Sequence, residues 1–323
     1  MRYTIFLLLV SGCMAIKPGM PSMTRIEFDA PDSYPEGIAY DKSADVYYVS
    51  SVRDGTIGKV TRQGMYSVLH ADSTLKSTYG IKVHPDGKRL FACVGDANYS
   101  RYSSSSTKRK MIRLISIDLS TGKRLSDIDL SKLIPEKHFG NDIAFDDKGN
   151  IYITDSFAHA IYKVTENGTA SVFAKDKQFE TAGVGLNGIV YHPGGFLLTA
   201  NSTKGKLFKV DINQPKNVQM VGTEQYFMGA DGLVLNDNNT LTMVVNGGTN
   251  KIFQLMTQDN WQTAKIKATT LAADSFGYPS TATMSGNEIW VMNAKFNELA
   301  DSTTMPAKKF TFQLADFRPI PNK

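Results

Sequence analysis

One pattern recurs six times in this chain and limits the folds it can adopt more than any other feature. Each copy contains an alternating strand rich in β-branched and aromatic residues, a turn of the D-x-x-G type, and a second strand that ends in small polar residues. This combination is typical of a β-hairpin. The copies begin with P-E-G-I-A-Y, T-Y-G-I-K-V, G-N-D-I-A-F, L-N-G-I-V-Y, A-D-G-L-V-L and Y-P-S-T-A-T.

The spacing of the copies predicts the architecture. They lie about 43 to 62 residues apart, a period typical of propellers and solenoids. A further strand follows each hairpin, for example G-K-L-F-K-V, and helical periodicity is nearly absent. We therefore predict an all-β fold, a six-bladed β-propeller with four antiparallel strands per blade, as a single domain over residues 24–318. The segment T-R-I-E-F, Thr24 to Phe28, is expected to complete the last blade and close the ring.

Composition and charge indicate a globular chain and do not favour nucleic-acid binding. The 323 residues are 41% hydrophobic and 21% charged, enough to bury a large core. The net charge of +5 is mild, and four of the basic residues lie in one Ser-rich stretch from Arg101 to Lys110. We interpret this stretch as a solvated loop. A monomer with no nucleic-acid partner is expected.

The N-terminus, residues 1–15, resembles a targeting segment. Arg2 precedes the apolar run T-I-F-L-L-L-V, which is too short to span a bilayer, and small residues follow. V-S-G-C, ending at Cys13, resembles a bacterial lipobox, which would make a lipid anchor at Cys13 the only membrane contact. Cleavage after Ala15 by an ordinary signal peptidase is the alternative. Both interpretations place the mature protein outside the cytoplasm, as a secreted, periplasmic or membrane-anchored protein. Cys93 is then the remaining cysteine and is expected to be a buried strand residue.

The entry of each first strand carries the residues of greatest functional interest. In propeller blades the first strand lines the central channel, so these positions should converge on one rim. Four of the six are acids or amides, which are depleted in strands. The aligned positions are Glu36, Tyr79, Asn141, Asn187, Asp231 and Pro279. Their oxygens suit a divalent cation, Ca²⁺ first and Mg²⁺, Mn²⁺ or Zn²⁺ as alternatives. The competing interpretation is that Asn and Asp only cap turns here.

The same segments resemble a known family, the SMP-30/gluconolactonase-like lactonases, which are six-bladed propellers. The resemblance covers about Pro35 to Asn293 and is most specific in F-G-N-D-I-A-F-D-D-K-G-N-I-Y-I-T-D-S, G-L-N-G-I-V-Y-H-P-G-G and G-A-D-G-L-V-L. It implies that Glu36, Asn187 and Asp231 hold one divalent cation, commonly calcium. It also implies that Asn141 approaches the metal or the substrate, and that Asp231 is the general acid/base.

The function that follows is hydrolysis of a small-molecule lactone or ester. A cation with few protein ligands keeps open positions at which a carbonyl can be polarised, while Asp231 moves the proton. His138 lies just before Asn141 and is a candidate substrate contact. No Ser-His-Asp signature or zinc H-E-x-x-H motif suggests another mechanism. The alternatives are a secreted, metal-stabilised propeller that binds a ligand or partner without turnover, and a propeller resembling the alkaloid synthases.

Overall fold

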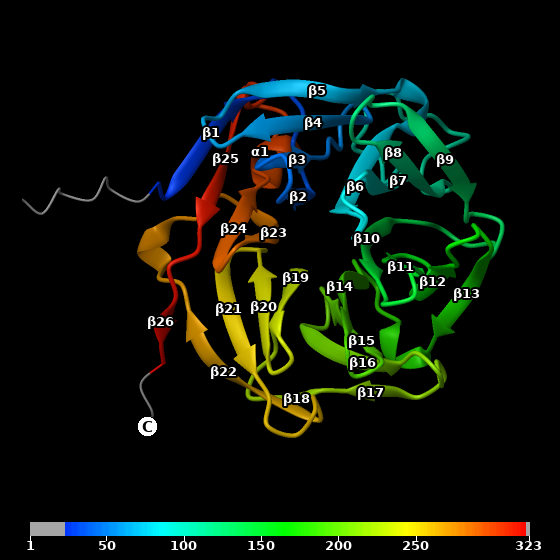
Figure 1. Ribbon diagram of the computed structural model, residues 1–323, viewed down its shortest axis with the longest axis vertical. Coiled ribbons are helices and arrows are strands. Elements are labelled where there is room, and N and C mark those ends of the chain that lie inside the picture. The colour runs from blue at the N-terminus through cyan, green and yellow to red at the C-terminus, as the bar shows by residue number, and fades with distance from the viewer. Residues whose placement is uncertain (1–22, 321–323) are drawn as a thin grey trace, which may run out of the picture.

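Six blades, five of them four-stranded, surround a central axis in the computed structural model, which describes residues 23–320. In Figure 1 the chain passes once around the ring, and the first strands of the six blades stand nearest its centre. The all-β six-bladed propeller expected from the repeat is therefore confirmed.

The strands follow the repeat blade by blade. Blade 1 contains β2 (Ile38–Asp41), β3 (Val46–Val49), β4 (Thr56–Thr61) and β5 (Tyr66–Ala71). Blade 2 contains β6 (Ser77–Val83), β7 (Arg89–Gly95), β8 (Ile112–Asp118) and β9 (Arg124–Asp129). Blade 3 contains β10 (Gly140–Phe145), β11 (Ile151–Asp155), β12 (Ala160–Val164) and β13 (Ala170–Lys175). Blade 4 contains β14 (Leu186–His192), β15 (Phe196–Asn201), β16 (Lys206–Asp211) and β17 (Val218–Met220). Blade 5 contains β19 (Ala230–Asp237), β20 (Thr240–Val245), β21 (Lys251–Met256) and β22 (Thr263–Thr269). Blade 6 contains β23 (Pro279–Ser285), β24 (Glu288–Asn293), β25 (Lys309–Leu314) and β1 (Arg25–Asp29).

The ring closes with a strand from the start of the described chain. β1 pairs antiparallel with β25, from Arg25 opposite Gln313 to Asp29 opposite Lys309, and supplies the outer strand of blade 6. In Figure 1 the blue β1 lies beside the red β25. The pairing covers an edge that would otherwise be open to other chains. Blade 5 departs from the four-stranded pattern because β18 (Gly222–Thr223) and β26 (Arg318–Pro319) both pair with β22.

The hydrophobic core is divided among the six blade interfaces. One cluster packs Ile143 and Ile153 of blade 3 against Leu114 of blade 2, for example, and five others fill the remaining interfaces. Middle strands are covered on both faces, and β20 and β15 are buried at every residue. Outer strands such as β5 are partly exposed. This explains why the second strands of the repeat are almost continuously apolar, since each face packs on a neighbouring blade.

A β-bulge opens five of the six innermost strands. In each, two residues of the inner strand lie opposite one residue of the next strand, as between Gly140 and Ile143 in blade 3 and between Ala230 and Leu233 in blade 5. A bulge breaks the strand's alternation and re-aims a side chain, and bulges often lie next to active sites. In four of the five strands the bulge contains the first-strand entry position singled out by the repeat, and in blade 6 it begins one residue after that position.

The inner strands approach one another closely at these bulges. A Cβ on Gly188 would lie 2.3 Å from the carbonyl oxygen of Asp231, and one on Gly232 would lie 2.1 Å from Oγ1 of Thr281. Real Cβ atoms do not approach other atoms so closely, so glycine is required at these positions. The G that follows the entry residue in most copies of the repeat is therefore a packing requirement of the central ring.

Helical structure is minor in the described part of the chain. It consists of α1 (Phe296–Ala300) and three short 3-10 turns at Ser73–Leu75, Lys177–Phe179 and Ala272–Asp274. No helix between residues 23 and 320 is long and apolar enough to cross a membrane. The targeting segment and Cys13 lie outside the described residues. Cys93 is fully buried and unpaired with another cysteine, as expected.

Candidate metal and catalytic site

Four of the predicted site residues come together at the axis, each from a different blade. Glu36 precedes β2, and the bulges of β10, β14 and β19 contain Asn141, Asn187 and Asp231. All four side chains are buried, with exposed fractions of 6%, 3%, 5% and 7%. Three of them line a narrow space at the axis together with Lys82. Asp231 belongs to the same cluster because its charge acts directly on Glu36.

Each of these four residues has one buried oxygen without a hydrogen-bond donor. The atoms are Glu36 Oε2, Asn141 Oδ1, Asn187 Oδ1 and Asp231 Oδ1. Among the described residues only four other buried side-chain atoms lack a partner, and they are scattered over the fold. An unpaired buried oxygen is unfavourable, so four at one place indicate a site built for a positively charged group.

The orientation of the Asn141 amide follows from its neighbours. The Ser156 hydroxyl donates its proton to the carbonyl oxygen of Leu186, at 2.5 Å. It can therefore only accept at Asn141, whose Nδ2 lies 3.2 Å away. Because the amide nitrogen is used in this bond, Asn141 offers its oxygen to the site. That oxygen can bind a cation or accept a proton from water or a hydroxyl, but it cannot donate to a substrate carbonyl.

A second amide orients Asp231. Nδ2 of Asn246, which follows β20, donates to Oδ2 of Asp231 at 2.5 Å. The other carboxylate oxygen, Oδ1, is buried and has no partner. One oxygen of Asp231 is thus fixed, and the other is available for a ligand or a proton.

Backbone contacts from blades 1 and 6 hold Glu36. The Ser50 hydroxyl accepts from the backbone nitrogens of Glu36 and Gly37, at 3.2 and 2.7 Å. Ser280 donates to the backbone oxygen of Glu36 at 2.6 Å. These bonds satisfy the backbone around Glu36 and leave its carboxylate to face the axis.

Burial dominates the electrostatics of the two acids. It raises the pKa of Glu36 well above its usual value, and the nearby charges of Asp231 and Asp142 raise it further, while Lys82 acts in the opposite direction. Burial likewise raises the pKa of Asp231, although the Asn246 amide partly opposes this effect. A divalent cation between the two acids would compensate both charges.

The sequence analysis missed a third buried acid, Asp142. It occupies the position at which four other blades have glycine. Its side chain lies beside Gly80 of the neighbouring blade, and a Cβ added to Gly80 would lie 2.7 Å from Asp142 Oδ1. Its oxygens accept backbone protons from Ile143 at 2.8 Å and Ile189 at 3.3 Å. Asp142 is therefore bound to the inner strands of blades 3 and 4 and adds negative potential to the site.

Two aligned positions do not contribute as the alignment suggested. Tyr79 is buried and packs against Phe139, and its hydroxyl accepts a hydrogen bond from the backbone nitrogen of Ala97, so the side chain turns away from the axis. In blade 6 the bulge contains Ser280 and Thr281, because Pro279 still pairs with Asn293. Ser280, not Pro279, is thus the counterpart of Glu36 in blade 6, and the alignment by sequence was one residue out of register.

His138 is buried, and both nitrogens of its ring have a hydrogen-bond partner. It is 1% exposed, with Nδ1 2.7 Å from Oδ2 of Asp155 and Nε2 3.2 Å from the carbonyl oxygen of Ser131. Both partners are proton acceptors. The structure therefore places His138 in a buried ion pair that ties the segment before β10 to β11, and the function proposed below does not use it.

This ion pair predicts a pH dependence of stability. Burial alone would lower the pKa of His138, but the hydrogen bond and charge of Asp155 outweigh it and raise the pKa. The pair should stabilise the fold fully below the unfolded pKa of about 6.5 and lose this effect as the pH rises through the folded pKa. Urea unfolding with saturating Ca²⁺ should show the difference between wild type and His138→Gln shrinking from pH 6 to pH 9. A difference that is constant with pH would contradict the assignment.

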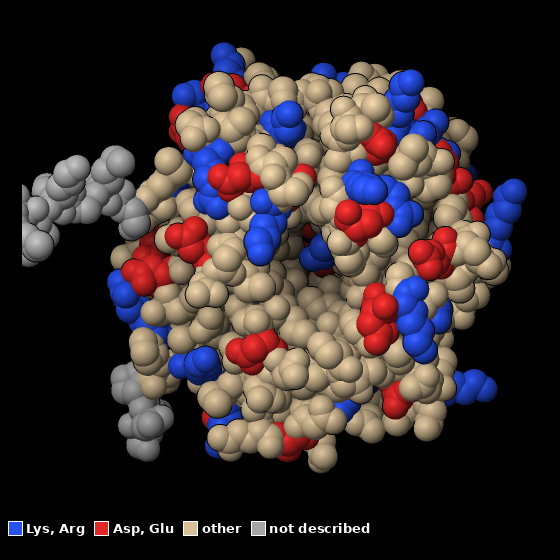
Figure 2. Space-filling model, viewed as in Figure 1, with Lys and Arg blue, Asp and Glu red and all other residues tan. Residues whose placement is uncertain are grey.

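The donor set of the site fits a hard cation. Within residues 23–320 no three His, Cys, Asp or Glu side chains are arranged to hold a metal, so the two amide oxygens are needed to complete the set. Carboxylate and amide oxygens suit Ca²⁺, Mg²⁺ or Mn²⁺, and zinc sites usually include His or Cys. The face of the ring in Figure 2 is hollowed at its centre, and most of the wall belongs to residues other than Lys, Arg, Asp and Glu.

The fold and the axial site define this chain as a six-bladed β-propeller with a buried, oxygen-lined centre. No protein-family model matches it, and no curated protein matches it by sequence. Solved structures do match. The major allergen Mala s 1 of Malassezia sympodialis has a TM-score of 0.73 at 17% identity over 92% of this chain and 97% of its own. A luciferin-regenerating enzyme has 0.60 at 14% over 91% and 98%.

A third match is a putative gluconolactonase, with a TM-score of 0.59 and 14% identity over 94% of this chain and 96% of its own. At such identities these similarities show a shared propeller fold and nothing finer. Enzymes and an allergen use this fold, so function has to be argued from the site.

Proposed function

We propose that this protein is a divalent-cation-dependent hydrolase of lactones or related esters. The observation that carries the proposal is the convergence of four unpartnered, buried oxygens, from Glu36, Asn141, Asn187 and Asp231, at the propeller axis. When bound there, a Ca²⁺ ion would polarise the substrate carbonyl and lower the pKa of a nearby water. A putative gluconolactonase has the same fold, so the propeller is compatible with this reaction class.

The residues divide the work as follows. Glu36, Asn187 and Asp231 hold the cation, and the oxygen of Asn141 is a fourth ligand or accepts a hydrogen bond from the attacking water. Asp231 also moves the proton. Asn246 holds its Oδ2, and Oδ1, which has two lone pairs, can face the cation and still accept the proton. The negative charge of Asp142 strengthens cation binding without using its own oxygens.

An assay of purified protein against a panel of lactones and aryl esters tests the proposal. We expect hydrolysis of at least one substrate, its loss by about a hundredfold or more after chelation, and its recovery when Ca²⁺ is added back. Hydrolysis at the same rate in chelator-treated protein would contradict the metal-dependent mechanism. Cation binding without turnover of any substrate would favour the second candidate, a metal-stabilised propeller that binds a ligand.

A further inference from the structure

Two long loops meet at the rim through aromatic side chains. Tyr99 belongs to the loop between β7 and β8 of blade 2, and Phe296 begins α1 in the loop after β24 of blade 6. Their rings stack with centroids 6.1 Å apart and an interplanar angle of 10°. Blade 1, which carries Glu36, lies between these two blades in the ring. The contact therefore bridges the neighbours of the Glu36 blade.

A third ring connects this pair to the site. Tyr278 packs against Phe296 with centroids 5.8 Å apart. It stands two residues before Ser280, which bonds to the backbone of Glu36. Burial raises the pKa of Tyr278, and the charge of Asp231 raises it further, so the phenol lies within electrostatic reach of Asp231. We call Tyr99, Tyr278 and Phe296 the aromatic clamp.

The backbone at Tyr278 is held in an unfavourable conformation. Its φ of 51° lies in the left-handed region, which is rare for an aromatic residue. Hydrogen bonds fix the segment, with Ala294 donating to the Tyr278 carbonyl at 3.1 Å and Gly277 donating to Oδ1 of Asn293 at 2.8 Å. Such strain persists only where the surroundings enforce it, and it concentrates at functional sites.

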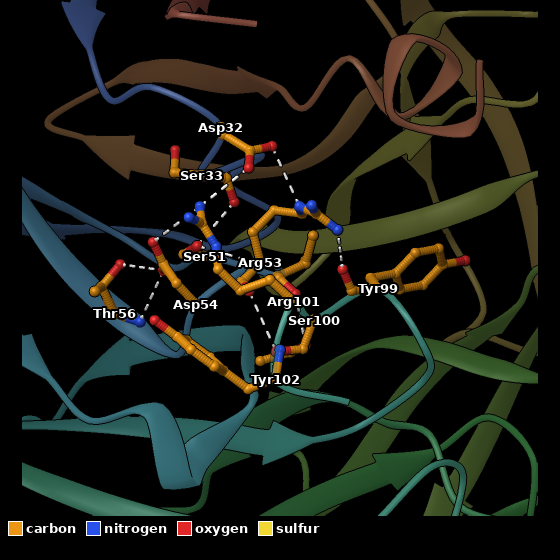
Figure 3. A network of polar contacts seen from close by, with 12 residues as sticks. Asp32, Ser33, Ser51, Arg53, Asp54, Thr56, Tyr99, Ser100, Arg101 and Tyr102 are labelled. Atoms are coloured by element: carbon orange, nitrogen blue, oxygen red, sulfur yellow. Dashed lines mark hydrogen bonds and ion pairs between the residues drawn. The ribbon is translucent and has the colours of Figure 1, made fainter. Parts of the chain in front are cut away.

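An ion-pair network sets the position of Tyr99 (Figure 3). Nη1 of Arg53 donates to the Tyr99 carbonyl at 2.6 Å, and Arg53 is itself paired with Asp32 at 3.2 Å. Arg101 also pairs with Asp32, at 3.0 Å. In Figure 3 the ring of Tyr99 points away from this network, whereas the ring of Tyr102 lies on its other side. The network thus fixes the base of the loop and leaves the Tyr99 ring, 40% exposed, free to contact a ligand.

Aromatic rings also flank the blade 3 side of the site. Phe139 stands two residues before Asn141 and packs against Phe157, which follows Ser156. The guanidinium of Arg109 lies 5.3 Å from the Phe157 ring. Aromatic rings therefore lie close to the entry of β10 as well as in the loops of blades 2 and 6, and pockets for partly apolar molecules are usually lined by such side chains.

We propose, on the basis of the hydrolase function above, that the aromatic clamp binds the apolar part of the substrate. The substrate class is then lactones or esters with an aromatic or alkyl group beside the carbonyl, and not polyhydroxylated sugar lactones. Such a group can stack on the rings at the rim, which leaves the oxygens at the axis available for the cation. The several hydroxyls of a sugar would find only the two tyrosine hydroxyls of the clamp as polar partners there.

The test compares an aromatic lactone, dihydrocoumarin, with glucono-1,5-lactone. In wild type, kcat/KM for dihydrocoumarin should exceed that for gluconolactone by about tenfold or more. Tyr99→Ala and Phe296→Ala should raise the KM for dihydrocoumarin by roughly five- to twentyfold with little change in kcat, and should leave the low kcat/KM for gluconolactone within about twofold. Phe296→Leu, which keeps most of the buried volume, should give a smaller change in the same direction. Tyr102→Ala is the matched control, because Tyr102 lies in the same loop as Tyr99 and is 42% exposed.

A binding measurement separates this proposal from the hydrolase function. The lactam analogue of dihydrocoumarin resists hydrolysis, and its affinity can be measured by calorimetry in the presence of Ca²⁺. Wild type should bind the lactam, and its affinity should fall by about five- to twentyfold in Tyr99→Ala and Phe296→Ala but not in Tyr102→Ala. This result would support the clamp even if no lactone is hydrolysed. Unchanged affinity in the clamp variants, equal weakening for both lactones, or no lactam binding in wild type would overturn it.

Discussion

Asp231→Asn should lower turnover of a good lactone or ester substrate by about a hundredfold or more while leaving the fold intact. Asparagine keeps an oxygen for the cation and fits the same space, but it cannot take the proton. The bond from Asn246 would have to reorganise, because its Nδ2 donates to a carboxylate oxygen of Asp231 and an asparagine side chain has only one oxygen. Steady-state kinetics at saturating Ca²⁺ measure the effect, with the thermal unfolding curve as a check on folding.

The matched control for this change is Asp237→Asn. Asp237 ends the same strand, β19, is exposed, and accepts a backbone proton from Asn239 at 2.8 Å that an asparagine oxygen can also accept. Its turnover should equal that of wild type. Wild-type rates in Asp231→Asn would remove Asp231 from the chemistry and leave it only a ligand role.

Ca²⁺ and the Glu36→Gln change should have opposite effects on stability. Without a cation the buried Glu36 carboxylate faces Asp231 and Asp142, so Glu36→Gln should unfold at a higher temperature than wild type at pH 8. With Ca²⁺ at about 1,000 times its Kd, wild type should gain about 4 kcal/mol and melt several degrees higher. The glutamine variant, which supplies less charge, should gain much less.

Differential scanning calorimetry of both proteins, with chelator and with Ca²⁺, measures this reversal of order. Glu166→Gln is the control, because Glu166 is exposed on a turn of blade 3 and should not change the response to Ca²⁺. Equal Ca²⁺ stabilisation of wild type and Glu36→Gln would show that the cation binds elsewhere.

The fold could be predicted because its determinants are local and periodic. Each hairpin carries its own alternation and turn, so the six copies indicate six blades, and the strand that closes the ring stands out before the first copy. The convergence of Glu36, Asn141, Asn187 and Asp231 follows from the same register. Propeller geometry turns a shared position in the repeat into a shared position in space.

What could not be predicted depends on departures from that periodicity. In blade 6 the bulge of β23 begins one residue later than the aligned sequence suggested, so Ser280 takes the place expected for Pro279. Asp142 substitutes for glycine in one copy, and its role depends on the space that Gly80 leaves in the neighbouring blade.

Long-range contacts were equally hidden from the sequence. Ser156 and Asn246 belong to the small polar residues that follow second strands, and no pattern in the sequence shows that each orients a site residue. The contact between Tyr99 and Phe296 joins loops of non-adjacent blades, and no local pattern encodes it.

Calorimetric titration of chelator-treated protein with Ca²⁺ tests the central claim most directly, because the account depends on a cation bound by oxygens from four blades. We predict saturable binding of about one ion per chain in wild type, at least about tenfold weaker binding in Asn187→Ala, and unchanged binding in Glu166→Gln. The absence of saturable binding for Ca²⁺, Mg²⁺ and Mn²⁺ alike, or wild-type affinity in Asn187→Ala, would contradict the account.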